Sequence, residues 1–178
     1  MRCGLIVWFT GVPGTGKTTL ASKLLQDLQH ANYASLWLDS DAMRPVLTPE
    51  ADYSSADRDF FYAALGHLAG LGADGGAVVV LSATASRAHY RDSVRARYPN
   101  RFVEIYLTVP PENLAQRDIK GLYRKSQSGD LSNLPGQGSP FDVPAMAELS
   151  FDTSLASAEV LAAKVWAEVH QRLQALAR

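Results

Sequence analysis

The feature that most constrains this chain is a glycine-rich segment near its N-terminus, Gly11-Val12-Pro13-Gly14-Thr15-Gly16-Lys17-Thr18. The segment matches every fixed position of the phosphate-binding loop pattern G-x-x-x-x-G-K-[ST]. A strand-like apolar run, Leu5–Phe9, leads into it, and a helix-like stretch, Lys17–Leu28, follows it. Because the pattern has meaning only between a strand and a helix, this context predicts a site for a nucleoside triphosphate.

The residue types of this loop suit the chemistry of bound phosphates. Glycines let the backbone curl so that successive N–H groups point inward, and Lys17 adds positive charge for the β and γ phosphates. The Thr18 hydroxyl is placed to bind Mg²⁺. We therefore expect ATP and Mg²⁺ as cofactors. The predicted ATP-binding residues of the loop are Gly11, Pro13, Gly14, Thr15, Gly16, Lys17, Thr18 and Thr19.

The hydrophobic pattern predicts an α/β fold. Strand-like runs lie at Leu5–Phe9, Ser35–Leu38, Ala77–Leu81, Phe102–Leu107 and, more weakly, Leu149–Phe151. Helical periodicity is present over Lys17–Leu28, Ser54–Leu71, Arg87–Arg97, Pro111–Asp118 and Leu155–Leu176. The apolar stripe of the last helix is expected to face the core, through Leu155, Val160, Leu161, Val165, Val169 and Leu173. Alternating strands and helices predict a three-layer P-loop NTPase fold, a parallel sheet flanked by helices, in a single domain over residues 1–178.

One segment interrupts this alternation. Residues 120–146 are polar and rich in Gly, Ser and Pro, with no sustained period, and they form a longer connection than a compact domain usually contains. Positive charge comes from Lys120, Arg124 and Lys125. We interpret the segment as a mobile lid over the nucleotide site.

Composition excludes several other classes of protein. The 178 residues carry a formal net charge of -1, which offers no general reason to bind nucleic acid or an anionic membrane. Cys3 is the only cysteine, so no disulfide framework is expected, and the four histidines show no metal-binding spacing. The sequence has no apolar run of about twenty residues that could span a bilayer. We expect a cytoplasmic protein whose partner is a small-molecule substrate.

Two aspartates, Asp39 and Asp41, follow the second predicted strand. Ligands of parallel α/β sheets lie at the carboxyl ends of strands, and residues two apart in an extended chain point to the same side. Both carboxylates can then face Mg²⁺ and triphosphate. This arrangement suits one as a metal ligand and the other as acceptor of a hydroxyl proton.

Arginines also gather near the predicted strand ends. Arg44 and Arg58 follow the aspartates, and Arg117 precedes the lid. A planar guanidinium binds phosphate or sulfate oxygens in a bidentate manner that a lysine cannot match. We therefore expect all three to bind ligands, whereas for Arg91 a ligand-binding role and a surface position are equally compatible with the sequence.

Several motifs occur together along the chain: Gly11–Thr19, Leu38–Asp41 with Arg44, Tyr53–Arg58, Gln116–Lys125 and Ser139–Phe141. Together they resemble the adenylylsulfate kinase family, P-loop enzymes that phosphorylate the 3′-hydroxyl of adenosine 5′-phosphosulfate. Arg117-Asp118 with Lys120-Gly121-Leu122-Tyr123 is much more specific than the phosphate-binding loop, which many unrelated enzymes share.

The resemblance implies a role for each matched residue and suggests a homodimer. Asp39 and Asp41 look like the family's Mg²⁺-associated and catalytic aspartates, and we assign the proton to Asp41 and the metal to Asp39. The other implied contacts are Arg44 and Arg58 with the phosphosulfate, Tyr53 with its adenine, Arg117 with the ATP adenine, and Lys120, Gly121 and Leu122 at the opening of the lid.

The chain also departs from the family pattern around the acceptor. Phe61-Tyr62-Ala63-Ala64 stands where the family usually has Asn-Ile-Arg-Arg, and Thr84-Ala85-Ser86-Arg87 replaces Ile-Ser-Pro-Tyr. Leu134 takes the place of the lid phenylalanine that covers the acceptor's adenine. We include Phe61 and Leu134 among the expected substrate-binding residues.

The favoured hypothesis is an ATP-dependent kinase of adenosine 5′-phosphosulfate with Lys17, Asp39 and Asp41 as catalytic residues. An alternative keeps the fold and changes the acceptor to another nucleotide, a sugar or a small metabolite. A GTPase-like switch is a third hypothesis, but the base-specifying Asn-Lys-x-Asp is absent from the sequence.

Overall fold

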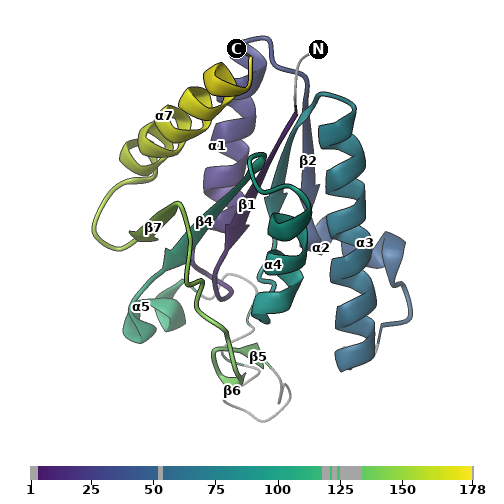
Figure 1. Ribbon diagram of the computed structural model, residues 1–178. Coiled ribbons are helices and arrows are strands. Elements are labelled where there is room, and N and C mark those ends of the chain that lie inside the picture. Colours follow the sequence, from purple (N-terminus) through teal and green to yellow (C-terminus); the bar gives the residue numbers. More distant parts are fainter. Residues whose placement is uncertain (1–3, 52–53, 118–120, 122–123, 125–133, 178) are drawn as a thin grey trace.

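A computed structural model describes residues 4–51, 54–117, 121, 124 and 134–177. Its centre is a five-stranded sheet in the order β2-β3-β1-β4-β7, and all neighbouring strands are parallel (Figure 1). The strands are β1 (Leu5–Thr10), β2 (Ser35–Asp39), β3 (Val78–Ser82), β4 (Phe102–Thr108) and β7 (Leu149–Asp152). Each overlaps a predicted strand, and the predicted α/β P-loop fold is confirmed.

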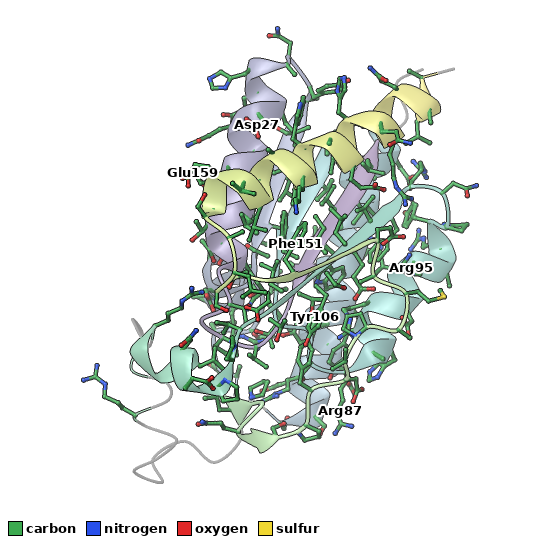
Figure 2. All side chains as sticks on the ribbon, turned by 90° about the vertical axis from the view of Figure 1, so that its left-hand side faces the viewer. Asp27, Arg87, Arg95, Tyr106, Phe151 and Glu159 are labelled. Atoms are coloured by element: carbon green, nitrogen blue, oxygen red, sulfur yellow. The ribbon has the colours of Figure 1, made fainter. Side chains whose placement is uncertain are left out.

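Helices cover both faces of this sheet. They are α1 (Lys17–His30), α2 (Ser40–Leu47), α3 (Ser55–Asp74), α4 (Ala88–Arg97), α5 (Pro111–Gln116) and α7 (Ala158–Leu176). Helices α1 and α7 pack on one face, and α3 and α4 on the other (Figure 1). In Figure 2, α7, with Glu159 at its start, crosses in front of the strands.

The central strand β1 explains why both faces must be covered. All six of its residues are fully buried. Leu5, Val7 and Phe9 pack into the core beneath α1 and α7, whereas Ile6 and Trp8 pack into the core beneath α3 and α4. Alternate side chains of a strand point to opposite faces, so a continuous apolar run requires a helical layer on each side.

One expectation about a helix is wrong, and one helix was not predicted. The unpredicted helix is α2, which contains Pro45, a residue that disfavours a helix interior. The apolar stripe of the last helix is shorter than predicted, because Leu155 precedes α7 and is 82% exposed, and Val160 is half exposed. Its buried part consists of Leu161, Val165, Val169 and Leu173, together with Ala162.

Part of the predicted lid is in contact with the body of the domain. Residues 118–120, 122–123 and 125–133 lie outside the described structure, and short strands β5 (Leu134–Pro135) and β6 (Gly138–Ser139) follow them. The Asp142 N–H then donates to the Ser86 carbonyl at 2.8 Å, and Arg95 Nη2 donates to the Met146 carbonyl at 3.1 Å. The end of the segment is therefore anchored to α4 and to the loop after β3.

Buried ion pairs join the edge strand β7 to the rest of the sheet. Glu104 of β4 forms an ion pair with Arg91, whose Nε lies 2.7 Å from Oε1, and a second with Arg95, whose Nη2 lies 3.1 Å from Oε2. Arg95 Nη1 also pairs with Glu148 at 2.7 Å, just before β7. Glu148 Oε2 in turn accepts the backbone N–H of Glu104 at 2.6 Å. This network connects α4, β4 and the start of β7.

The network predicts how stability responds to acid. Burial acts to raise the pKa of Glu148, but hydrogen bonds from Arg95 and from the Glu104 backbone outweigh it, so the pKa lies below its ordinary value of 4.5. A depressed carboxyl pKa adds stability above the unfolded-state value, and this stability is lost as pH falls through the folded-state value. We expect Glu148→Gln to be less stable at about pH 7 and to lose less stability than wild type below about pH 4.5.

Urea unfolding at several pH values, followed by circular dichroism, measures this difference. Arg172→Gln is a suitable control, because Arg172 Nη2 lies 3.8 Å from the same carboxylate but is itself one-third exposed. Parallel stability curves for wild type and Glu148→Gln over the acidic range would contradict the assignment.

Candidate active site

The phosphate-binding loop connects β1 to α1 and depends on two glycines for different reasons. Gly11 has φ 144, and a Cβ there would lie 2.2 Å from the Leu107 carbonyl oxygen of β4. Gly16 has φ 90, and among the described residues nothing lies within 4 Å of the position that its Cβ would take. Gly11 thus permits close packing of two backbones, whereas Gly16 keeps open space before the first turn of α1.

The N-terminus of α1 forms an electropositive end facing that space. Gly16 is its N-cap residue and has no side chain to accept from the first-turn N–H groups, and the first turn carries no acidic residue. The N–H groups at the start of a helix and the helix dipole favour an anion at this point. Lys17 Nζ donates to the carbonyls of Gly11 and Val12 at 2.9 and 3.0 Å, so its ammonium group lies across the loop.

Asp39 is held by contacts with three elements of the fold. Its Oδ2 accepts from Thr18 Oγ1 of α1 at 3.2 Å and from Ser82 Oγ of β3 at 2.6 Å. Its Oδ1 accepts from the Asp41 N–H at 2.9 Å and caps α2. A fixed carboxylate oxygen beside a hydroxyl is a hard-oxygen pair that suits Mg²⁺.

The sequence analysis did not identify Ser82, although the sheet register explains its position. Ser82 and Asp39 are partners in the parallel pairing of β3 with β2, so both end at the same level of the sheet. Trp37 Nε1 also donates to Ser82 Oγ at 3.0 Å. Its position in the sequence, as a polar residue directly after a strand-like apolar run, could have indicated Ser82 as a candidate site residue.

The expected geometry of Asp41 is wrong, although its neighbourhood is as expected. Asp41 does not extend β2, because the Asp39 side chain caps a helix and places Asp41 in its first turn. Its side chain is exposed. Together with Arg44 and Arg58, Asp41 acts electrostatically on the buried hydroxyl of Tyr62. The carboxylate of Asp41 and the guanidinium groups of Arg44 and Arg58, on α2 and α3, therefore all lie within electrostatic reach of this hydroxyl.

Phe61 does not offer a free ring surface to a substrate, which corrects its assignment as a contact residue. It is fully buried, and the Arg44 guanidinium carbon lies 3.9 Å from the centre of its ring. Such cation–π stacking orients the guanidinium group. Phe61 therefore influences this part of the site through Arg44.

Tyr62 is a buried polar residue that the sequence analysis noted only as a departure. Burial raises the pKa of its hydroxyl above the ordinary value, although the Ala85 N–H acts in the opposite direction. That N–H donates to the Tyr62 hydroxyl at 3.0 Å. The ring packs against Tyr90, with centroids 4.5 Å apart. Tyr62 thus remains protonated and links α3 to the loop after β3.

Arg117 lies beside a cavity of 280 Å³ at the start of α1. Its Nη1 donates to Thr153 Oγ1 at 2.9 Å and its Nη2 to the Thr153 carbonyl at 3.1 Å. The cavity is lined by Gly16, Thr19, Leu20, Arg117, Thr153, Ala156, Ser157, Ala158 and Leu161. Its position next to the phosphate-binding loop suits the base of a nucleotide. The loop from β7 to α7 was missed in the sequence, although it too follows the carboxyl end of a strand.

The remaining predicted residues are distributed differently. Tyr53, Lys120 and Leu122 lie outside the described residues. Gly121 has φ 66, a conformation that favours glycine. Leu134 is 4% exposed and packs with Val109, Leu114 and Val12. Its burial in this apolar cluster does not present it as a cover for an acceptor base.

Two further observations bear on the kind of site. Among the described residues there is no group of three or more His, Cys, Asp and Glu side chains arranged to hold a metal. A Mg²⁺ that takes only a hydroxyl and one carboxylate from the protein, with nucleotide phosphates and water completing its shell, is consistent with this finding. None of the described helices is long and apolar enough to span a membrane.

Comparison with known proteins gives a consistent result. The family model described as adenylylsulphate kinase matches residues 3–152. The adenylyl-sulfate kinase of Shewanella sp. (strain ANA-3) is 40% identical over 151 residues, which cover 84% of this chain and 74% of that protein.

Solved structures agree with the sequence relatives. The Mycobacterium tuberculosis APS kinase CysC, solved in complex with AMPPNP and APS, superposes with a TM-score of 0.86 at 31% identity, covering 93% of this chain and 96% of that chain. A hexameric APS kinase from Thiobacillus denitrificans gives a TM-score of 0.71 at 25% identity, covering 96% of this chain and 29% of that chain.

The two loop glycines yield a prediction about ligand binding. In Gly16→Ala, the left-handed φ costs on the order of 1–3 kcal/mol, and the added methyl group enters the space before α1. We expect this variant to fold and to lose the rise in melting temperature that ATP produces by binding the folded state. In Gly11→Ala, the clash with the Leu107 backbone should lower the melting temperature strongly even without ATP. Thermal unfolding with and without MgATP distinguishes the two, and a wild-type ATP response in Gly16→Ala would contradict this account.

Proposed function

The chain belongs to the adenylylsulphate kinase family, and we propose that it transfers the γ-phosphoryl group of ATP to the 3′-hydroxyl of adenosine 5′-phosphosulfate (APS), giving 3′-phosphoadenylyl sulfate. The observation that carries this proposal is the hydrogen bond between Thr18, at the end of the phosphate-binding loop, and Asp39 at the carboxyl end of β2, with Asp41, Arg44 and Arg58 within electrostatic reach of the nearby Tyr62 hydroxyl. The loop suits ATP, and Asp41 with the two arginines suits an acceptor that carries both a hydroxyl and an anionic group.

Phosphoryl transfer requires in-line positioning and neutralisation of charge on the phosphoryl oxygens. In the proposed mechanism the loop amides and the N-terminus of α1 bind the phosphates, and Lys17 moves from the loop carbonyls to the β and γ phosphates. Arg117 and the cavity beside Thr153 hold the adenine. These groups supply positive charge from fixed positions, so little reorganisation accompanies the reaction.

Thr18 and Asp39 would hold Mg²⁺. Their oxygens lie 3.2 Å apart, and Ser82 fixes the carboxylate through a hydrogen bond of 2.6 Å. A Mg²⁺ held there would supply neutralisation of the charge on the nucleotide phosphates. Because Asp39 also caps α2, the metal ligand and the helix carrying Asp41 are held in one arrangement.

The acceptor would bind on the side of α2 and α3. Arg44 and Arg58 hold the phosphosulfate, and Asp41 accepts or orients the proton of the 3′-hydroxyl. Tyr53, Lys120, Gly121 and Leu122 contribute from the acceptor side and the lid, which excludes water as a competing nucleophile. A homodimer, suggested by the resemblance, and a cytoplasmic location, expected from the composition, stay predictions.

The proposal is tested by an acceptor panel with the purified chain. In a coupled ADP-release assay we expect turnover with ATP and APS, little turnover with GTP, and none with sugars or other nucleotides. Lys17→Ala should lower turnover by on the order of a thousandfold, because its charge is needed at the β and γ phosphates.

Lys23→Ala is the matched control, since Lys23 lies in the same helix but pairs with Glu159 of α7 at 2.9 Å. We expect it to keep full activity. Near-wild-type turnover in folded Lys17→Ala, or an acceptor other than APS preferred by wild type, would overturn the proposal.

The stacking of Arg44 on Phe61 gives a second kinetic prediction. Phe61→Leu keeps an apolar core side chain but removes the aromatic surface beneath Arg44, an interaction of about 0.5–2 kcal/mol. The KM for APS should therefore rise by roughly twofold to thirtyfold, while the KM for ATP stays unchanged. Phe60→Leu is the control, because the neighbouring Phe60 is 62% exposed. Equal changes in both KM values would indicate a general packing defect.

A further inference from the structure

The loop that leaves β3 contains an unusual backbone position, Ala85. Its φ is 42, and only Asn32 shares a positive φ among the described residues other than glycine. An alanine rarely adopts this left-handed conformation, and it persists only where surrounding contacts hold it. Ala85 is fully buried, so the contacts that hold it come from within the protein.

Two buried side chains bind the backbone of Ala85 on its two polar atoms. The Tyr62 hydroxyl accepts from the Ala85 N–H at 3.0 Å, and Arg91 Nη1 donates to the Ala85 carbonyl. Tyr62 comes from α3 and Arg91 from α4. Arg91 is 1% exposed, and its Nε pairs with Glu104 of β4 at 2.7 Å. The guanidinium group is therefore anchored to the sheet on one side and to the loop on the other.

The same guanidinium group also holds the end of the predicted lid. Arg91 Nη2 donates to the Asp142 carbonyl at 2.6 Å. Asp142 is fixed further, because its N–H donates to the Ser86 carbonyl and its Oδ2 accepts from the Ala88 N–H at 2.9 Å. Arg91 therefore connects two segments that are more than fifty residues apart in the chain.

This loop lies between the two halves of the site. The Thr84 carbonyl accepts from Thr10 Oγ1 at 2.7 Å, and Thr10 directly precedes the phosphate-binding loop. On the other side, the Tyr62 hydroxyl accepts a hydrogen bond from the Ala85 N–H, and the charges of Arg44, Arg58 and Asp41 act on the pKa of that hydroxyl. A shift of the Ala85 peptide would thus displace the loop after β3 and the Tyr62 side chain, which lie next to the residues proposed to bind the acceptor.

We propose that Arg91 and Tyr62 are positioning residues that hold the Ala85 peptide in its left-handed conformation and thereby shape the acceptor half of the site. The inference rests on the proposed function for the identity of the acceptor. A buried ion pair by itself is weak evidence of stabilisation, since well-packed apolar residues often serve as well. Arg91 donates from Nη1 and Nη2 to two different backbone carbonyls, those of Ala85 and Asp142, and this pair of contacts requires an arginine at the position.

Two variants remove the two contacts independently. Tyr62→Phe deletes the acceptor of the Ala85 N–H and preserves the ring packing. Arg91→Lys keeps the positive charge near Glu104, but one ammonium group cannot reproduce the separate contacts of Nε, Nη1 and Nη2. Loss of a buried hydrogen-bond partner predicts a rise of about fivefold to a hundredfold in the KM for APS, with a change of less than about twofold in the KM for ATP.

Arg95→Lys is the matched control. Arg95 lies one turn further along α4, but within the described residues it contacts Glu104, Glu148 and the Met146 carbonyl rather than Ala85 or Asp142. It should lower thermal stability and leave the ratio of the two KM values unchanged. Circular dichroism melts identify any variant that fails to fold, and if Arg91→Lys does, Tyr62→Phe still tests the inference.

The outcomes separate this inference from the proposed function. Wild type that does not phosphorylate APS overturns the proposed function. The positioning role is overturned if the wild type is active on APS but Tyr62→Phe or folded Arg91→Lys raises both KM values equally, or raises neither. A selective rise in the KM for APS in these variants, absent in Arg95→Lys, supports it.

Discussion

Complete burial of the central strand determines where chemistry can occur in this protein. Strand β1 is covered on both faces by apolar cores, so its six side chains offer no access to solvent. Parallel neighbours end at the same edge of the sheet, and polar groups can meet only there. Thr10, Asp39 and Ser82 terminate three adjacent strands at this edge. The phosphate-binding loop emerges at the same level, where Gly11 passes close to the β4 backbone.

The two halves of the site are supported in different ways. On the ATP side, backbone geometry dominates: loop glycines, the start of α1 and a cavity formed with the β7–α7 connection. On the acceptor side, side chains carry the arrangement: Phe61 lies beneath Arg44, and Tyr62 contacts the Ala85 peptide. Contacts made by the backbone depend little on residue identity, except where glycine is required. The ATP-binding motif of this chain matches the family pattern, whereas the motif around the acceptor departs from it.

Ion pairs that lie away from the phosphate-binding loop also support the proposed acceptor side. The Arg91–Glu104 pair extends from β4 to the loop after β3, and Arg95 with Glu148 extends it to the start of β7. These contacts attach the end of the segment predicted as a lid to the body of the domain. Asp142 and Met146 are therefore held in place, although the composition predicted a mobile lid over the whole of residues 120–146.

The sequence by itself determined the fold class, the phosphate-binding loop and the family, because these depend on local periodicity and on residue types at fixed spacing. It could not determine that Asp41 lies in the first turn of a helix, since that depends on the Asp39 side chain accepting from the backbone N–H groups that follow it. Nor could it show that Phe61 and Leu134 are buried, that Ser82 and Thr153 belong to the site, or that Arg91 reaches Ala85 and Asp142. Those facts arise from packing between segments distant in the chain, and only the tertiary structure decides which side chains then have room to meet a ligand.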